Sequence, residues 1–175
     1  MRRLTDRERL QRFMRRLGRE SKTEARVYLT GGASAVLHDW RATTVDVDLR
    51  IEPDNGEVLR AIPGIKEELE INVELASPGD FIPELPGWRD RSPFISREGQ
   101  LSFHHYDFHA QALSKIERGH ERDIRDVEAM LERELVTTPG LLRYFAVIEP
   151  ELYRYPAITP AVFRTALEAF IAGHA

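Results

Sequence analysis

Two short stretches decide how this chain is expected to fold: Tyr-Leu-Thr-Gly-Gly-Ala-Ser at residues 28–34 and Thr-Val-Asp-Val-Asp-Leu at residues 44–49. In the first, a β-prone segment stops at two glycines and leads into a short helix expected over 33–40. In the second, apolar and polar residues alternate, which predicts a strand over 44–51 with one buried face. A similar alternation predicts a further strand over 70–76. The residues expected on the buried faces are Val45, Val47 and Leu49 in one strand and Ile71, Val73 and Leu75 in the other.

The glycines and aspartates of these stretches suit phosphate and metal binding. Gly31 and Gly32 lack Cβ atoms, so a phosphate group can approach the backbone closely where the helix begins, and Ser34 can add a hydroxyl donor. Residues two apart on a strand point the same way, so Asp46 and Asp48 are expected to project together from one face. Two such carboxylates stay ionised only beside a cation. Their hard oxygen atoms favour Mg²⁺ or Mn²⁺, which bridges phosphates while keeping several waters.

The rest of the chain is expected to form helices and one strand pair, which gives an α+β fold with a small mixed β-sheet flanked by helices. Residues 77–93 are rich in proline and glycine but should be ordered, because Phe81, Ile82, Leu85 and Trp88 favour burial. The expected domains are a core over 1–132, with an amphipathic helix at its start, and a helical appendage over 133–175 in the same domain. The expected helices are 6–20, starting at a capping box on Thr5, 57–62, 110–118, 121–132, 139–148 and 160–172, the last two capped by Thr138 and Thr159; the strand pair is 94–95 and 101–106.

Composition narrows the class of protein. The chain has 175 residues, of which 42% are hydrophobic and 31% charged, as in an ordinary globular protein. No cysteine is present, which excludes disulfides and thiolate metal sites and favours the cytoplasm. No apolar run approaches the ~20 residues needed to cross a bilayer, so a membrane partner is not expected. Eight arginines lie between Arg2 and Arg19; they favour either a solvated helix face or a surface for RNA or another polyanion.

Taken together, these motifs resemble a known family. A hydrophobic strand ending in Gly-Gly and followed by an Asp-x-Asp between apolar residues resembles the polymerase-β-like nucleotidyltransferase superfamily, and Arg-Ala-Thr-Thr at 41–44 is similar to the Arg-x-Thr that introduces this motif in bacterial members. Residues 111–118 and Arg-Asp-Ile-Arg-Asp-Val at 122–127 are similar to two helices of the abortive-infection and toxin-type members. The resemblance covers residues 26–132.

The resemblance implies an enzyme that moves a nucleoside monophosphate from a nucleoside triphosphate, such as ATP, to a hydroxyl group and releases pyrophosphate. The paired acids of the family bind two metal ions. Carried over to this sequence, the catalytic metal ligands are Asp46 and Asp48, and the nucleotide-binding residues are Gly31, Gly32, Ser34, Lys115 and Arg118.

Several assignments stay open. The family has a third carboxylate on a neighbouring strand, for which Glu74 is the candidate, although Asp80 or Asp107 would also serve and Glu74 would equally face solvent. Without the resemblance, Lys115 would be a solvated surface lysine. The side chains of Arg122, Asp123, Arg125 and Asp126 have the spacing of ion pairs along one helix, with Asp126 as an alternative base.

The acceptor is open as well. It could be the 3′ end of a tRNA or another RNA, a protein side chain, or a small molecule, and the basic first helix favours a nucleic acid. The resemblance to toxin-type members implies an antitoxin protein as a partner. The alternative hypothesis is a catalytically silent nucleotide-binding or protein-interaction module on the same fold.

Overall fold

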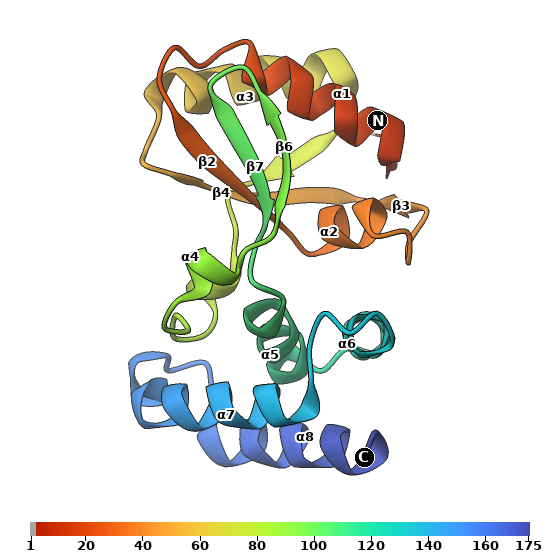
Figure 1. Cartoon of the computed structure of the whole chain (residues 1–175), viewed down its shortest axis with the longest axis vertical. Coiled ribbons are helices and arrows are strands. Elements are labelled where there is room, and N and C mark those ends of the chain that lie inside the picture. Colours follow the sequence, from red (N-terminus) through yellow and green to blue (C-terminus); the bar gives the residue numbers. More distant parts are fainter. Residues whose placement is uncertain (1–2) are drawn as a thin grey trace. The chain divides into compact units, whose positions relative to one another are not determined.

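The computed structural model describes residues 3–175 and divides the chain into two compact units (Figure 1). Unit 1 comprises Met1–Ser77 and Ser92–Tyr106, and unit 2 comprises Pro78–Arg91 and Asp107–Ala175. The expected boundary near residue 132 stays a prediction. In the part of the chain described, no helix combines the length and the apolar character needed to cross a membrane.

Unit 1 is built on a mixed five-stranded sheet with the strand order β5-β4-β2-β7-β6. The central strand β2 pairs antiparallel with β4 and parallel with β7, and β5 pairs parallel with the other side of β4. A separate two-stranded ribbon joins β1 to β3. The expected α+β fold with a mixed sheet is confirmed. The strands are β1 Thr5–Asp6, β2 Ala25–Thr30, β3 Thr43–Thr44, β4 Asp46–Glu52, β5 Asn72–Glu74, β6 Phe94–Glu98 and β7 Leu101–His105.

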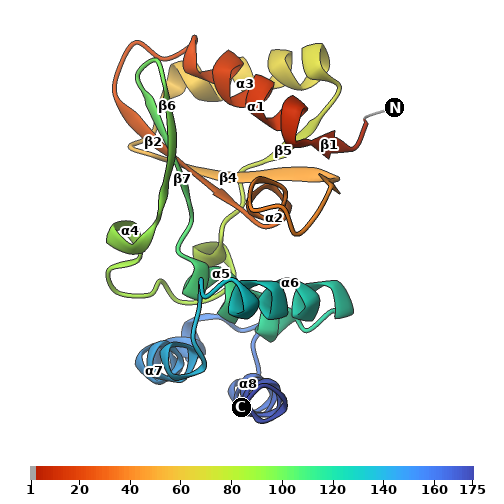
Figure 2. The same cartoon turned by 45° about the vertical axis from the view of Figure 1, so that its right-hand side comes forward.

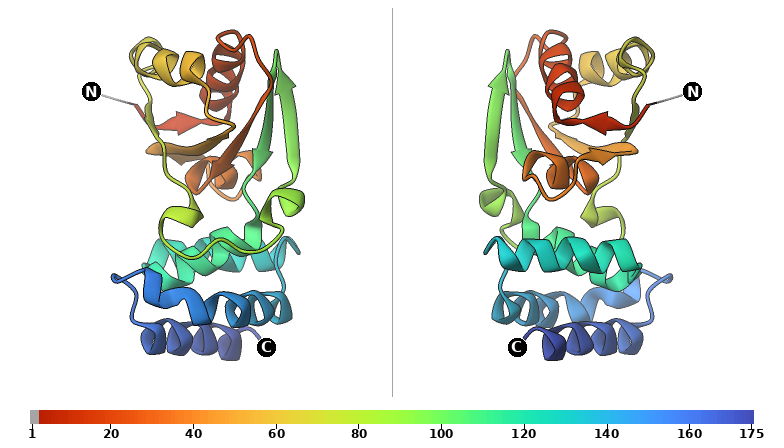
Figure 3. Two further views of the ribbon diagram at one scale, coloured as in Figure 1. Left: turned by 90° about the vertical axis from the view of Figure 1, so that its left-hand side faces the viewer. Right: turned by 90° about the vertical axis from the view of Figure 1, so that its right-hand side faces the viewer.

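Helices α1 (Arg7–Gly18) and α3 (Gly56–Leu69) lie together on one face of this sheet (Figures 1 and 3). Apolar residues recur along both helices with helical spacing, so each helix presents one apolar stripe to the sheet. The stripe of α1 packs in one core with the inward side chains of the strands. That core includes Leu10, Phe13 and Leu17 from α1 and Val27, Leu29, Val47, Leu49 and Phe103 from the sheet. The short helix α2 (Gly32–Leu37) follows β2 directly.

Unit 2 is helical (Figure 2). Helix α5 contacts each of α6, α7 and α8. The loop expected to be ordered contributes Ile82, Leu85 and Trp88 to buried positions, as predicted, whereas Phe81 is exposed and was predicted wrongly. The elements are η1 Pro78–Asp80, α4 Trp88–Arg91, α5 Phe108–Arg118, α6 Glu121–Glu132, α7 Thr138–Ile148, η2 Glu149–Arg154 and α8 Pro160–Gly173.

Two helix starts differ from the sequence prediction by one residue. The cap of α1 is Asp6, whose side chain accepts a hydrogen bond from the Arg9 amide at 2.9 Å, and Thr5 lies in β1 instead. The cap of α7 is Thr137, which accepts from the Gly140 amide at 3.0 Å and leaves Thr138 inside the helix. In both places two neighbouring residues have side chains that can cap a helix, and spacing alone does not distinguish them.

Helix α3 is longer than expected, because it continues through Pro63 to Leu69. Proline weakens a helix interior, but the buried side chains on both sides of it keep one apolar face continuous. The expected buried faces of two strands were wrong at their ends. Val45 and Leu75 are 56% and 60% exposed, because β4 begins at Asp46 and β5 ends at Glu74.

Candidate functional site

Asp46 and Asp48 lie on the first half of β4, on the face away from α1 and α3. Along the strand, half-buried residues alternate with the fully buried Val47 and Leu49. The two carboxylates therefore project from the same face, as the period of a strand requires. Because the neighbouring apolar side chains are fixed in the core, the acids rest on a rigid element.

The turn after β2 lies beside the second of these acids. Thr30 pairs directly with Asp48 across the antiparallel strands, and the chain turns immediately after it. Gly31 has φ 61° and ψ −132°, a conformation that side chains other than glycine rarely adopt. A Cβ atom on Gly31 would lie 3.1 Å from Asp48 Oδ2. The glycine thus allows the backbone to approach a carboxylate that any larger residue would displace.

Gly32 is required for a different reason. A Cβ atom at this position would lie 1.9 Å from Thr44 Oγ1, so the Thr44 hydroxyl already occupies that space. The same hydroxyl donates to the backbone carbonyl of Asp46 at 2.9 Å. Thr44 therefore connects the glycine turn to the start of the strand that carries the acids.

Strand β5 places two more polar residues opposite the acids. In the parallel register, Asn72 is the partner of Asp46 and Glu74 is the partner of Asp48. The amide nitrogen of Asn72 donates to Asp46 Oδ1 at 2.5 Å and to Glu74 Oε1 at 3.3 Å. Sequence reasoning missed Asn72, although its spacing of two residues from Glu74 already placed both on one strand face.

Ser34 is fully buried in this structure. Its hydroxyl donates to the Leu29 carbonyl at 3.2 Å and lies 3.0 Å from His105 Nδ1. Burial lowers the pKa of His105 to about 3, with smaller contributions from His38 and His104, so this ring is neutral near pH 7. Ser34 and His105 together tie the start of α2 to β2 and β7. A contact between Ser34 and a phosphate stays a prediction.

Lys115 and Arg118 lie in unit 2 and join α5 to α6 through ion pairs. Lys115 is buried, and its Nζ lies 2.8 Å from Asp126 Oδ2 and 3.7 Å from Asp123 Oδ1. Arg118 Nε donates to Asp123 Oδ2 at 2.8 Å. Burial opposes the ionisation of Asp123, but the Arg118 hydrogen bonds and the nearby Lys115 charge outweigh it and lower its pKa. These pairs give both cations a structural role, while contact with a nucleotide stays a prediction.

The two alternative carboxylates also lie in unit 2. Asp107 is buried, accepts from Arg91 Nη2 at 2.8 Å and caps α5 through the His109 amide. Asp80 ends the short η1 turn. Only Glu74 among the three candidates belongs to the sheet of Asp46 and Asp48 and faces Asp48 across adjacent strands.

The carboxylate oxygens of Asp46 and Asp48 suit a hard divalent cation whose other ligands are phosphate oxygens and water. Among the residues described, no three His, Cys, Asp or Glu side chains lie close enough together to hold a metal ion. Mg²⁺ commonly takes only one or two carboxylates from a protein and completes its shell with phosphate oxygens and water. The pair Asp46 and Asp48 fits that mode of binding.

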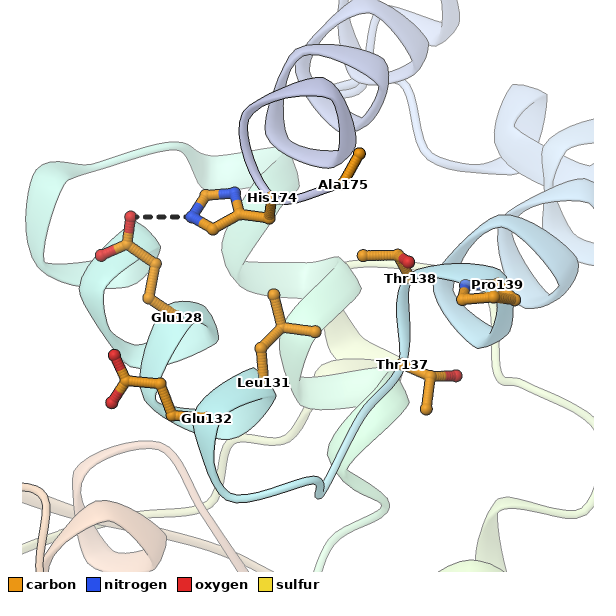
Figure 4. Close-up of a pocket in the computed structure, with 8 residues that line it drawn as sticks. All are labelled: Glu128, Leu131, Glu132, Thr137, Thr138, Pro139, His174 and Ala175. Atoms are coloured by element: carbon orange, nitrogen blue, oxygen red, sulfur yellow. Dashed lines mark hydrogen bonds and ion pairs between the residues drawn. The ribbon is translucent and has the colours of Figure 1, made fainter.

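A pocket in unit 2 involves none of the predicted site residues (Figure 4). It lies between the end of α6, the start of α7 and the end of α8. Glu128 and His174 both line the pocket, and His174 Nε2 lies 3.1 Å from Glu128 Oε1. The pocket therefore shares no residue with the group around Asp46 and Asp48.

Comparison with known proteins identifies the family of the chain. Residues 8–145 match the model of a family described as "Nucleotidyltransferase of unknown function (DUF6036)". The chain belongs to this family. The matched segment contains both glycines, both acids and Glu74, as well as Lys115 and Arg118, so the nucleotidyltransferase resemblance inferred from the sequence is confirmed at the level of the superfamily. No match was found among curated proteins or among solved structures.

The low pKa of His105 predicts a specific sensitivity to acid. The pKa is about 3 in the folded chain, against the ordinary value of 6.5. The folded chain therefore favours the neutral ring, and the stability associated with this preference is complete above pH 6.5 and is lost as the pH falls toward 3. Between pH 7.5 and pH 5, His105→Gln should lose about 2 kcal/mol less unfolding free energy than wild type. Urea unfolding at both pH values measures this difference. The exposed His174→Gln variant is the control, and equal losses in wild type and His105→Gln would contradict the assignment.

The ion pairs of Lys115 predict a large effect on stability. Lys115→Met leaves the buried Asp126 without its cation and should lower the free energy of unfolding by about 3–5 kcal/mol. Replacing both partners, in Lys115→Met with Asp126→Leu, should recover most of that loss. Urea unfolding of both variants, with the exposed Lys22→Met as control, tests this. If Lys115 were solvated, Lys115→Met would change the free energy of unfolding as little as Lys22→Met does.

Proposed function

We propose that the chain is a metal-dependent nucleotidyltransferase that moves a nucleoside monophosphate from a nucleoside triphosphate to a hydroxyl group. The observation that carries the proposal is the position of Gly31, whose missing Cβ atom would lie 3.1 Å from Asp48 Oδ2. A glycine turn and a pair of carboxylates on one strand face meet at this point. A triphosphate on Mg²⁺ needs both, namely a backbone that phosphates can approach and anionic oxygen ligands.

The proposed reaction is an in-line displacement at the α-phosphorus. The acceptor oxygen forms a bond to this phosphorus, the bond to the oxygen bridging the α- and β-phosphates breaks, and pyrophosphate leaves with that oxygen. Asp46 and Asp48 would hold Mg²⁺ or Mn²⁺, which supplies charge neutralisation for the phosphates. The residues of the chain contribute position and electrostatics more than covalent chemistry.

The proton of the acceptor hydroxyl needs a base. We assign this role to Glu74, because it is exposed and lies opposite Asp48 on the adjacent strand. Asn72 donates to both Asp46 and Glu74, which fixes the two carboxylates relative to each other. Asp107 fits less well, since its carboxylate already accepts from Arg91 and from a backbone amide.

A polyanionic acceptor, such as tRNA or another RNA, is supported by the outer face of α1. Arg7, Arg9 and Arg16 bond to carbonyls or carboxylates of the chain. Arg12, Arg15 and Arg19 are exposed, and within residues 3–175 their side chains make no hydrogen bond or ion pair. Their spacing of three and four residues places them on one helix face, where guanidinium groups can bind successive phosphates. The role as a toxin, with an antitoxin partner, rests on the resemblance alone.

Removing one carboxylate should abolish transfer without unfolding the chain. Asp46→Asn and Asp48→Asn keep the size of the side chain but lose the anionic ligand, so transfer of labelled nucleotide should fall by at least roughly a hundredfold. Incubation with each labelled nucleoside triphosphate, Mg²⁺ and total RNA or lysate measures this, with the exposed Asp54→Asn as control. Chelation of Mg²⁺ should have the same effect as either variant.

A binding measurement separates an enzyme from a silent module on the same fold. Mg²⁺ and a nucleoside triphosphate together should stabilise the native wild-type chain by about 2.7 kcal/mol at a hundredfold excess over Kd. Joint stabilisation without any labelled product would favour the silent nucleotide-binding module. Full transfer activity in either asparagine variant would refute the metal assignment.

The arginines of α1 predict how an RNA acceptor binds. Replacing Arg12, Arg15 and Arg19 together by alanine should weaken RNA binding and reduce its salt dependence. The slope of log K against log salt should fall by roughly 0.7 for each phosphate that these side chains no longer neutralise. Filter binding at several salt concentrations measures both quantities. The triple lysine variant keeps the charge and is the matched control. An unchanged slope in the alanine variant would remove this surface from the binding site.

A further inference from the structure

The guanidinium group of Arg41 lies beside the glycine turn, on the side formed by Gly32. A Cβ atom built on Gly32 would lie 3.5 Å from Arg41 Nη1, while one built on Gly31 would lie 3.1 Å from Asp48 Oδ2. Two adjacent glycines thus have a cation next to one and an anion next to the other.

The backbone of Arg41 is held in place by α2. The loop after the helix folds back, so that the amides of Trp40 and Arg41 both donate to the Ala35 carbonyl, at 3.1 Å and 3.3 Å. His38 stacks on Trp40 within the same loop, with ring centroids 5.8 Å apart. Arg41 is half-buried. The backbone that carries this guanidinium therefore belongs to an ordered loop.

The two cations that the resemblance assigned to the nucleotide, Lys115 and Arg118, lie in unit 2. Lys115 and Arg118 form ion pairs with Asp123 and Asp126, two cations with two anions, so their charge is balanced within unit 2. A triphosphate carries several negative charges, and the leaving pyrophosphate gains one more as the reaction proceeds. Arg41 is a cation that the structure places at the glycine turn, and its planar fork of donors suits two phosphate oxygens at once.

We propose that Arg41 binds the β- and γ-phosphates of the donor nucleotide, and the pyrophosphate that leaves, on the Gly32 side of the turn. This inference rests on the proposed function. Asp46 and Asp48 would hold the metal ions on the Gly31 side. Arg41 would neutralise the negative charge of the phosphates that the metal ions do not neutralise. The chemical class of ligand is a polyphosphate, and the base of the nucleotide plays no part in this contact.

Binding of inorganic pyrophosphate with Mg²⁺ tests the assignment without requiring turnover. In titration calorimetry, Arg41→Ala should raise the Kd for pyrophosphate by about 10- to 100-fold, because charge-assisted hydrogen bonds are removed. Arg41→Lys keeps the charge but not the fork and should fall between wild type and Arg41→Ala. The exposed Arg60→Ala should bind as wild type does. A nucleoside monophosphate lacks the β- and γ-phosphates, so its affinity should be the same in wild type and Arg41→Ala.

The outcomes distinguish the inference from the function on which it rests. Wild-type affinity for pyrophosphate in Arg41→Ala would overturn the role of Arg41 and leave the metal-binding acids untouched. An equal loss of affinity for pyrophosphate and for the monophosphate would also overturn it, since that is the result of a distorted turn. If wild type binds neither pyrophosphate nor a nucleoside triphosphate with Mg²⁺, both proposals fail. Where Arg41→Ala does not fold, the comparison of Arg41→Lys with wild type decides in the same way.

Discussion

The candidate site depends on one close approach between backbone and side chains, at the end of β2. The antiparallel register pairs Thr30 with Asp48, so the first residue of the following turn lies against the Asp48 carboxylate. The next residue lies against Thr44. The turn is therefore enclosed by two side chains of one short segment, and only glycine fits at either place. A methyl group at Gly32 would overlap the Thr44 hydroxyl, which itself holds the carbonyl of Asp46.

The same strand supplies both stability and the polar face. Val47 and Leu49 are fully buried, and burial of a side chain of this kind contributes about 1.5–3 kcal/mol each. This contribution offsets the repulsion between Asp46 and Asp48, which the two-residue period places on one face. The cross-strand position of Glu74 adds a third negative charge. Asn72 reduces the repulsion by donating to Asp46 and Glu74, which explains why an amide lies between carboxylates.

Much of this arrangement could be predicted from the sequence, because it depends on local periodicity. Alternation along residues 44–51 indicated the common face of Asp46 and Asp48, and the two glycines indicated the turn.

The strand ends could not be predicted in this way, and Val45 and Leu75 were placed wrongly, because pairing with neighbouring strands decides where a ladder stops. The cap of α1 was misplaced by one residue, because Thr5 and Asp6 both have side chains that can cap a helix and the structure uses Asp6. Interactions between segments far apart in the sequence were harder to predict. Nothing in the local sequence places Asn72 against Asp46, because that hydrogen bond requires β5 to pair parallel with β4 in one particular register. The position of Arg41 beside Gly32 likewise requires the loop after α2 to fold back on Ala35. For Asp123 and Asp126, the helical spacing indicated ion pairs along one helix, whereas the structure pairs them with Lys115 and Arg118 of the preceding helix.

The three carboxylates on this face are a physical reason to expect a site that binds cations. Like charges directly opposite each other on adjacent strands destabilise a sheet, and Glu74 lies opposite Asp48 while Asp46 lies two residues away. A chain that used this fold only as a scaffold would be more stable with neutral residues at these positions. A divalent cation held by Asp46 and Asp48 would weaken this repulsion, because its positive charge would lie beside both carboxylates. The repulsion between these carboxylates is thus a physical argument for a function that brings a cation to this face.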